Sequence, residues 1–244
     1  MKLLVSDYDG TFATSEEDIR INCDMLTKYI SRGNMFVLSS GRSLASLKRK
    51  VETYNIPYNF LATCDGSFLF DKDGKLLMAD TMEHDILDKL EDLKKIKIYD
   101  RIDYAYVEDY GRVYDPDKKI GCVTAVVEDK NLTKEFLDEF EKLKRENPNY
   151  DYIVYGFNGI TYYGVKPKGN NKSTPIKFLE RKLKLSSSDI YTVGDNLNDV
   201  EMIRDYNGYA IGNNEEVIRN AVDRYGAVHE LITDINKRKV LKRW

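Results

Sequence analysis

Two aspartates stand directly after the first apolar segment, in the run Asp7-Tyr8-Asp9-Gly10-Thr11. Residues two apart on a strand point to the same side, so these carboxylates would be crowded together. Such a pair repels unless a cation or a shared proton compensates. Asp7 could therefore attack a phosphorus atom while binding Mg²⁺, which prefers oxygen ligands, and Asp9 could act as general acid and base. The alternative interpretation is a simple turn that caps a helix.

A second polar cluster, Ser39-Ser40-Gly41-Arg42, follows the apolar segment 35–38. A hydroxyl and backbone N–H groups at a strand-to-helix junction are well suited to hold phosphate oxygens. Ser40 is the predicted hydroxyl and Gly41 contributes backbone to the same phosphate site. An ordinary helix N-cap is the alternative.

A third candidate is Lys172, in a segment that also contains Lys166 and Lys168. Most lysines are solvated surface charges, but Lys172 lies where a long insert ends and a helix begins. A cation there could neutralise both a nucleophile and the charge that develops on a transferring phosphoryl group. Lys166 and Lys168 remain competing candidates.

The fourth cluster runs from Gly194 to Asp199 after another apolar segment. Asp195 is predicted to complete a metal site with Asp7 and Asp9, the latter through its backbone carbonyl. Asn198 is expected to bind the phosphate, and Asp199 to hold Lys172 by an ion pair. An N-capping aspartate in an ordinary loop is the alternative.

These clusters must be positioned by the elements before them. Short apolar segments alternate with helical ones, which predicts a doubly wound, Rossmann-like parallel α/β sheet. In such sheets, ligands bind beyond the carboxyl ends of the strands, so the four clusters should converge. The expected strands are 3–6, 35–38, 60–63, 190–193 and 208–211, and the expected helices are 17–32, 43–54, 174–184, 198–205 and 215–224.

A stretch of different character, 82–167, interrupts this pattern and contains ten of the 18 tyrosines. Alternation with period two is typical of an antiparallel sheet with one open face. We expect an inserted α+β domain between two parts of a core domain, 1–81 and 168–244. Its expected strands are 104–107, 121–127, 152–157 and 161–165, and its expected helices are 84–95 and 132–146.

Composition excludes several classes of protein. The 244 residues are 42% hydrophobic and 32% charged, with a net charge of −3, which is typical of a globular protein. No basic excess points to nucleic acid, and no run approaches the roughly 18 apolar residues of a membrane span. Three separated cysteines, Cys23, Cys64 and Cys122, favour a reducing, cytoplasmic location.

The motifs resemble, in their order, those of the haloacid-dehalogenase-like phosphatase superfamily, Cof-type branch. The resemblance implies Mg²⁺-dependent hydrolysis of a small phosphorylated metabolite, such as a sugar phosphate or a phosphorylated cofactor, through an aspartyl-phosphate on Asp7. The insert matches the cap position of that branch, and Gly212-Asn213 resembles a further signature. One departure is Asp65-Gly66, where the branch commonly has Asn-Gly.

Two other functions stay open at this point. One is a phosphomutase of the same superfamily, which would return the phosphoryl group to its substrate. The other is a non-catalytic ligand-binding or regulatory module, which need not keep both Asp7 and Asp9. No pattern in the sequence indicates an oligomeric state.

Overall fold

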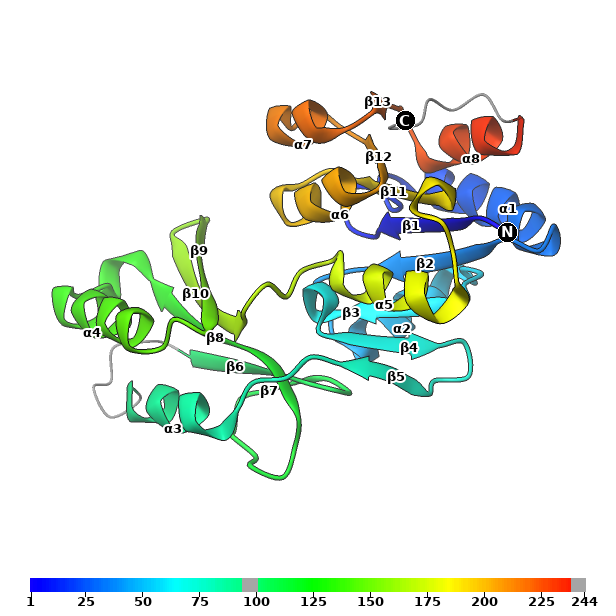
Figure 1. Cartoon of the computed structure of the whole chain (residues 1–244). Helices are drawn as coiled ribbons and strands as arrows, with labels where there is room; N and C mark the ends of the chain where they lie inside the picture. Colours follow the sequence, from blue (N-terminus) through cyan, green and yellow to red (C-terminus); the bar gives the residue numbers. More distant parts are fainter. Residues whose placement is uncertain (94–100, 238–244) are drawn as a thin grey trace. The chain divides into compact units, whose positions relative to one another are not determined.

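The chain divides into two compact units in the computed structural model, which describes residues 1–93 and 101–237. One unit contains Met1–Met78 and the segment that starts at Asn171, and the other is Ala79–Asn170. The second unit contains the predicted insert 82–167, and both are drawn in Figure 1.

A mostly parallel sheet forms the first unit, with the order β13-β12-β11-β1-β2-β3-β4-β5. Four of its strands, β1, β3, β11 and β12, are buried along their whole length, because helices cover both faces. At one side of the sheet, β4 pairs with β3 in the antiparallel direction, and β5 is the edge strand. The strands are β1 (Leu3–Asp7), β2 (Met35–Ser39), β3 (Phe60–Thr63), β4 (Phe68–Asp71), β5 (Leu76–Ala79), β11 (Ile190–Gly194), β12 (Asn207–Ala210) and β13 (Asp223–Arg224).

Helices lie on both faces of this sheet (Figure 1). One face packs against α5 (Thr174–Leu183), α6 (Val200–Asp205) and α7 (Glu215–Asn220), whose apolar side chains share a core with β1 and β11. On the other face, α1 (Glu16–Ser31) packs against α8 (Val228–Lys237), and α2 (Leu44–Tyr54) connects β2 to β3. The predicted doubly wound α/β fold is confirmed.

The prediction of a helix over 215–224 is wrong at its C-terminal end. The helix stops at Asn220, and the next residues join the edge of the sheet as β13. Val222 N–H donates to the Gly208 carbonyl at 2.7 Å, and Tyr225 N–H donates to that of Ala210 at 3.0 Å. Backbone pairing with β12 therefore outweighs continuation of the helix. The hairpin of β4 with β5 and the helix α8 were not among the predicted elements.

The second unit is an antiparallel sheet with the order β7-β6-β8-β10-β9. The predicted α+β insert is thus confirmed as a fold, although residues 94–95 of the expected helix 84–95 lie outside the described residues. The strands are β6 (Arg101–Tyr106), β7 (Tyr110–Gly111), β8 (Ile120–Glu128), β9 (Tyr150–Phe157) and β10 (Ile160–Pro167), and the helices are α3 (His84–Leu93) and α4 (Lys134–Glu146).

Alternate residues of this sheet form its core with the two helices. Val123 and Val127 of β8 lie in the same apolar cluster as Phe136 and Phe140 of α4. The Tyr163 ring packs edge-on against both phenylalanines, with ring centroids 4.8 and 5.0 Å away. Several tyrosines of the insert are therefore core residues. Among the described residues, no helix is long and apolar enough to cross a membrane.

Candidate active site

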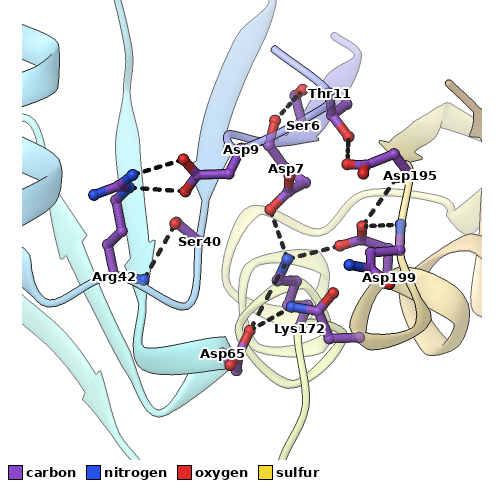
Figure 2. A network of polar contacts seen from close by, with 12 residues as sticks. Ser6, Asp7, Asp9, Thr11, Ser40, Arg42, Asp65, Lys172, Asp195 and Asp199 are labelled. Carbon is purple, nitrogen blue, oxygen red and sulfur yellow. Dashed lines mark hydrogen bonds and ion pairs between the residues drawn. The ribbon is translucent and has the colours of Figure 1, made fainter. Parts of the chain in front are cut away.

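The polar clusters meet at one edge of the parallel sheet, beyond the carboxyl ends of β1, β2, β3 and β11 (Figure 2). Asp7 is the last residue of β1, and Asp195 follows β11 directly. These two strands are neighbours, and the order of strands along the chain reverses between them. The site therefore lies at the switch point where open α/β sheets bind their ligands.

Lys172 is the buried cation of this site, with only 1% of its surface exposed. Its Nζ donates to Asp7 Oδ1 at 2.6 Å and to Asp199 Oδ1 at 2.7 Å. Burial disfavours the charged ammonium, but the carboxylates of Asp7, Asp199 and Asp65 outweigh it and hold the Lys172 pKa well above its ordinary value. The lysine therefore stays protonated throughout the physiological range.

Asp199 connects this lysine to the loop after β11 by hydrogen bonds. While Oδ1 accepts from Lys172, Oδ2 accepts from the backbone N–H groups of Asp195 and Asn196 at 3.0 and 3.1 Å. Both oxygens of Asp199 are thus already engaged. The structure places Asp199 where the sequence predicted an ion-pair partner for Lys172.

Asp195 lies against the loop that follows β1. Its Oδ1 accepts from Thr11 Oγ1 at 2.5 Å. Gly10 has a φ of +82°, and a Cβ there would lie 2.5 Å from Asp195 Oδ2. Gly10 is required both for its left-handed backbone and for this close approach.

Oxygens of Asp7, Asp195 and Asp199 lie within 4.8 Å of one another, a spacing that suits a bound cation. Burial raises the pKa of Asp7 well above its ordinary value, opposed by Lys172 and reinforced by Asp199. Burial also raises the pKa of Asp195, opposed by its hydrogen bond from Thr11. Because Asp199 already has partners for both oxygens, Asp7 and Asp195 are the carboxylates best able to hold a hard cation such as Mg²⁺.

Asp9 extends away from that group of oxygens and pairs with Arg42. Its two carboxylate oxygens accept from Nε and Nη2 of Arg42, each at 2.7 Å. Ser46 Oγ accepts from Nη1 of the same guanidinium at 3.2 Å. The Asp9 carboxylate is therefore not part of the oxygen cluster. The predicted metal contact of Asp9 is through its backbone carbonyl, which these hydrogen bonds do not involve, and it stays a prediction.

Ser40 and Asn198 lie near the same strand ends. Ser40 is buried, and its Oγ accepts from Arg42 N–H at 3.2 Å. Asn198 is exposed and donates from Nδ2 to Asp65 Oδ1 at 2.9 Å. Gly41 lies beside the Asp65 carboxylate, since a Cβ on Gly41 would be 3.0 Å from Asp65 Oδ2.

The two lysines that competed with Lys172 belong to the second unit. Lys166 lies in β10, and Lys168 Nζ is 3.3 Å from Asp151 Oδ1 in that unit. Of these three lysines, Lys172 is the one that contacts the acidic residues at the strand ends.

The sequence patterns indicated no role for Arg42 or Thr11, and Asp65 stood out only as a departure from the Asn-Gly of the Cof-type branch. All three belong to the strand-end segments that were singled out. A signal for Arg42 was present, because a planar guanidinium two residues after Ser40 can bind a carboxylate with two parallel hydrogen bonds.

Comparison with known proteins agrees with this geometry. The chain is 26% identical over 257 residues to the 5-amino-6-(5-phospho-D-ribitylamino)uracil phosphatase YcsE of Bacillus subtilis, covering 100% of this chain and 96% of that protein. Its fold is similar to that of the phosphatase BT1666 from Bacteroides thetaiotaomicron, with a TM-score of 0.77, 18% identity and coverage of 99% and 96% of the two chains. The subclass IIB sugar phosphatase BT4131 gives a TM-score of 0.73 at 15% identity, covering 97% and 99%.

The model of one protein family matches residues 4–230, which is nearly the whole described chain. This match confirms the resemblance that the four motifs predicted, and with it the prediction of a hydrolytic enzyme. The chain belongs to the haloacid dehalogenase-like hydrolase family.

Proposed function

We propose that this protein is a Mg²⁺-dependent phosphatase that hydrolyses small phosphorylated metabolites through an aspartyl-phosphate on Asp7. The observation that carries the proposal is the buried Lys172, which joins Asp7 to Asp199 at 2.6 and 2.7 Å beside Asp195. Family membership and the relatives that are phosphatases support the same class, a phosphoric monoester hydrolase.

The residues present fit a divalent cation. Asp7 and Asp195 offer carboxylate oxygens, and burial raises the pKa of both, although Lys172 opposes the shift at Asp7 and Thr11 opposes it at Asp195. When bound, Mg²⁺ would supply positive charge that neutralises the phosphate oxygens and lowers their repulsion from Asp7. Thr11 holds Asp195 in place by its hydrogen bond.

Asp7 is the nucleophile in this proposal. One of its carboxylate oxygens attacks phosphorus, and the bond from phosphorus to the leaving-group oxygen breaks. Lys172 stabilises the negative charge of the reaction, since its ammonium contacts Asp7 and can stabilise charge on the transferring phosphoryl group. Ser40 and the backbone around Gly41, together with Asn198, are assigned to the phosphate oxygens.

Asp9 is the proton-transfer group. It donates a proton to the departing oxygen in the first step, so the leaving group departs as an alcohol. In the second step it accepts a proton from the water that attacks the phosphoryl group on Asp7. The phosphorus–carboxylate bond then breaks, which releases inorganic phosphate and restores Asp7. Arg42 orients Asp9 for both transfers.

The insert is assigned to substrate selection. In this proposal residues 82–167 act as a cap on a core formed by 1–81 and 168–244, with connections near Asp80 and Gly169 that permit a hinge. Closure of such a domain would exclude water from the leaving group and add contacts to it. Exposed apolar side chains of its sheet, such as Ile153 and Val154 of β9, would be available for such contacts.

A panel of phosphorylated metabolites tests the proposal, with 5-amino-6-(5-phospho-D-ribitylamino)uracil and hexose phosphates as the first compounds. We expect release of inorganic phosphate in the presence of Mg²⁺ and none from the Asp7→Asn variant. Isomerised phosphate esters without phosphate release would instead indicate a phosphomutase. Binding of these compounds without any chemical change would indicate a non-catalytic module.

A further inference from the structure

Asp65 occupies an unusual place in the candidate active site. It follows β3 in a short turn, Cys64–Gly66, and its φ of +51° lies in the left-handed region that aspartate and asparagine tolerate. Its backbone N–H donates to the Ser40 carbonyl at 3.2 Å. The turn therefore fixes the Asp65 side chain beside the cluster that follows β2.

The Asp65 carboxylate contacts groups that the proposed function assigns to the phosphate. Asn198 Nδ2 donates to Oδ1 at 2.9 Å. Lys172 Nζ faces the same oxygen (Figure 2), at a distance of 3.9 Å. The other oxygen, Oδ2, lies close to the backbone of Gly41, because a Cβ built on Gly41 would be 3.0 Å from it. The carboxylate is thus surrounded by the backbone, amide and ammonium groups that would bind an anion.

The charge of Asp65 is not needed to balance Lys172. That ammonium already donates to two buried carboxylates, Asp7 and Asp199, at hydrogen-bond distance. Asp65 is a third carboxylate, with 41% of its side chain exposed, and its oxygen is beyond hydrogen-bond distance from the lysine. An incoming phosphate would meet this additional negative charge next to its own binding groups.

We propose that Asp65 is an internal competitor of the phosphate anion that promotes product release, an inference that rests on the proposed phosphatase function. In the free enzyme its carboxylate engages Asn198 and faces Lys172. When phosphate binds, it takes these donors and remains close to a like charge. Asp65 thereby weakens the binding of inorganic phosphate and favours release of this product.

The variant Asp65→Asn isolates the charge. Asparagine tolerates the same left-handed backbone and keeps an oxygen that accepts from Asn198, so only the negative charge is lost. Asp65→Gly is a second variant. Glycine also tolerates the left-handed backbone, and this change removes the whole side chain. Asp73→Asn is the matched control, because this exposed aspartate lies in the hairpin between β4 and β5, at the opposite end of the strands.

The experiment is calorimetric titration of inorganic phosphate into the full-length protein in Mg²⁺. A like charge a few ångströms from the ligand predicts that Asp65→Asn binds phosphate at least about tenfold more tightly than the unaltered protein. Asp65→Gly should also bind more tightly, and Asp73→Asn should not differ from the unaltered protein. The inhibition constant of phosphate in turnover should fall by the same factor in Asp65→Asn.

The outcomes separate this inference from the proposed function. If the unaltered protein binds phosphate and Asp65→Asn binds it equally or more weakly, Asp65 positions Asn198 and is not a competitor, and the inference is overturned while the phosphatase stands. If neither protein binds phosphate and neither releases it from any ester, the inference and the proposed function both fail.

Discussion

Arg42 holds both carboxylate oxygens of Asp9 in a two-pronged ion pair, with nitrogen–oxygen distances of 2.7 Å. The guanidinium carbon also lies 5.7 Å from the centre of the Tyr8 ring, and Ser46 accepts from its third nitrogen. Three contacts thus fix the orientation of Arg42, which in turn fixes the carboxylate that we assign to proton transfer.

Replacing Arg42 with lysine should remove this orientation but keep the positive charge. We expect kcat for alkyl phosphates to fall on the order of 10–100-fold, because their leaving group needs a well-placed proton. The aryl oxide of an aryl phosphate leaves without a proton, so the rate at which aryl phosphates form the phosphoryl-enzyme should change little. Steady-state and single-turnover kinetics on both ester types make the comparison. Arg49→Lys on the exposed surface of α2 is the control, and equal losses for the two ester types would contradict the role of Arg42.

Metal removal should abolish hydrolysis. Asp7 is buried and Asp195 is half-buried beside it, and the single ammonium of Lys172 faces these two acids together with Asp199. A phosphate dianion therefore needs a further cation to approach them. EDTA is expected to stop phosphate release, and Mg²⁺ to restore it. A second readout is thermal unfolding, where Mg²⁺ at 100 times its Kd would add about 2.7 kcal/mol of stability. The Asp195→Asn variant should lose this increase. Undiminished turnover in chelator would contradict the metal assignment.

Lys172→Met should destabilise the first unit strongly. It leaves Asp7 and Asp199 buried without the ammonium that both contact, and breaking a buried pair typically costs about 3–5 kcal/mol. Denaturant unfolding measures this change. Lys168→Met is the matched control, since its ion pair with Asp151 is exposed and should contribute little. Equal stability of the two variants would show that Lys172 does not compensate the acids.

Asp205 should make stability depend on pH in the acid range. Burial alone would raise the Asp205 pKa, but hydrogen bonds from Lys177 and Ser173 outweigh it and hold the pKa below the ordinary 3.8. A lowered carboxyl pKa stabilises the fold above the unfolded value, and this stabilisation is lost as pH falls through the folded value.

The variant Asp205→Asn tests that sign. Its melting temperature should lie below that of the unaltered protein at pH 5–8, and the difference should shrink below about pH 4. Asp24→Asn, an exposed change in α1, should show no such trend. A difference that grows on acidification would mean that the Asp205 pKa is raised.

The convergence of the clusters was predictable because it depends on local patterns. Asp7 and Asp195 each end an apolar run, and neighbouring parallel strands bring their carboxyl ends to one edge of the sheet. Lys172 was also predictable by position, where the insert returns to the core. These features follow from topology and need no knowledge of side-chain orientation.

Other features depend on orientation that no local pattern encodes. Asp9 and Arg42 are 33 residues apart in the sequence, and Asp65 and Asn198 are 133 apart. Each contact therefore depends on the conformations and relative positions of two loops. The end of the helix at Asn220 was missed for a related reason. Its sequence favours continuation of the helix, whereas the hydrogen bond from Val222 N–H to the Gly208 carbonyl on β12 places the next residues at the edge of the sheet.

The site of the covalent intermediate tests the central claim most directly. The Asp9→Asn variant should be mixed with an aryl phosphate and Mg²⁺, quenched in acid, and mapped by peptide mass spectrometry. The first step then proceeds without a proton donor, but the second step lacks its base, so a phosphoryl group should accumulate on Asp7. The double variant with Asp7→Asn should carry none. A phosphoryl group on Ser40, or hydrolysis by Asp7→Asn at the unaltered rate, would contradict the assignment of Asp7 as nucleophile.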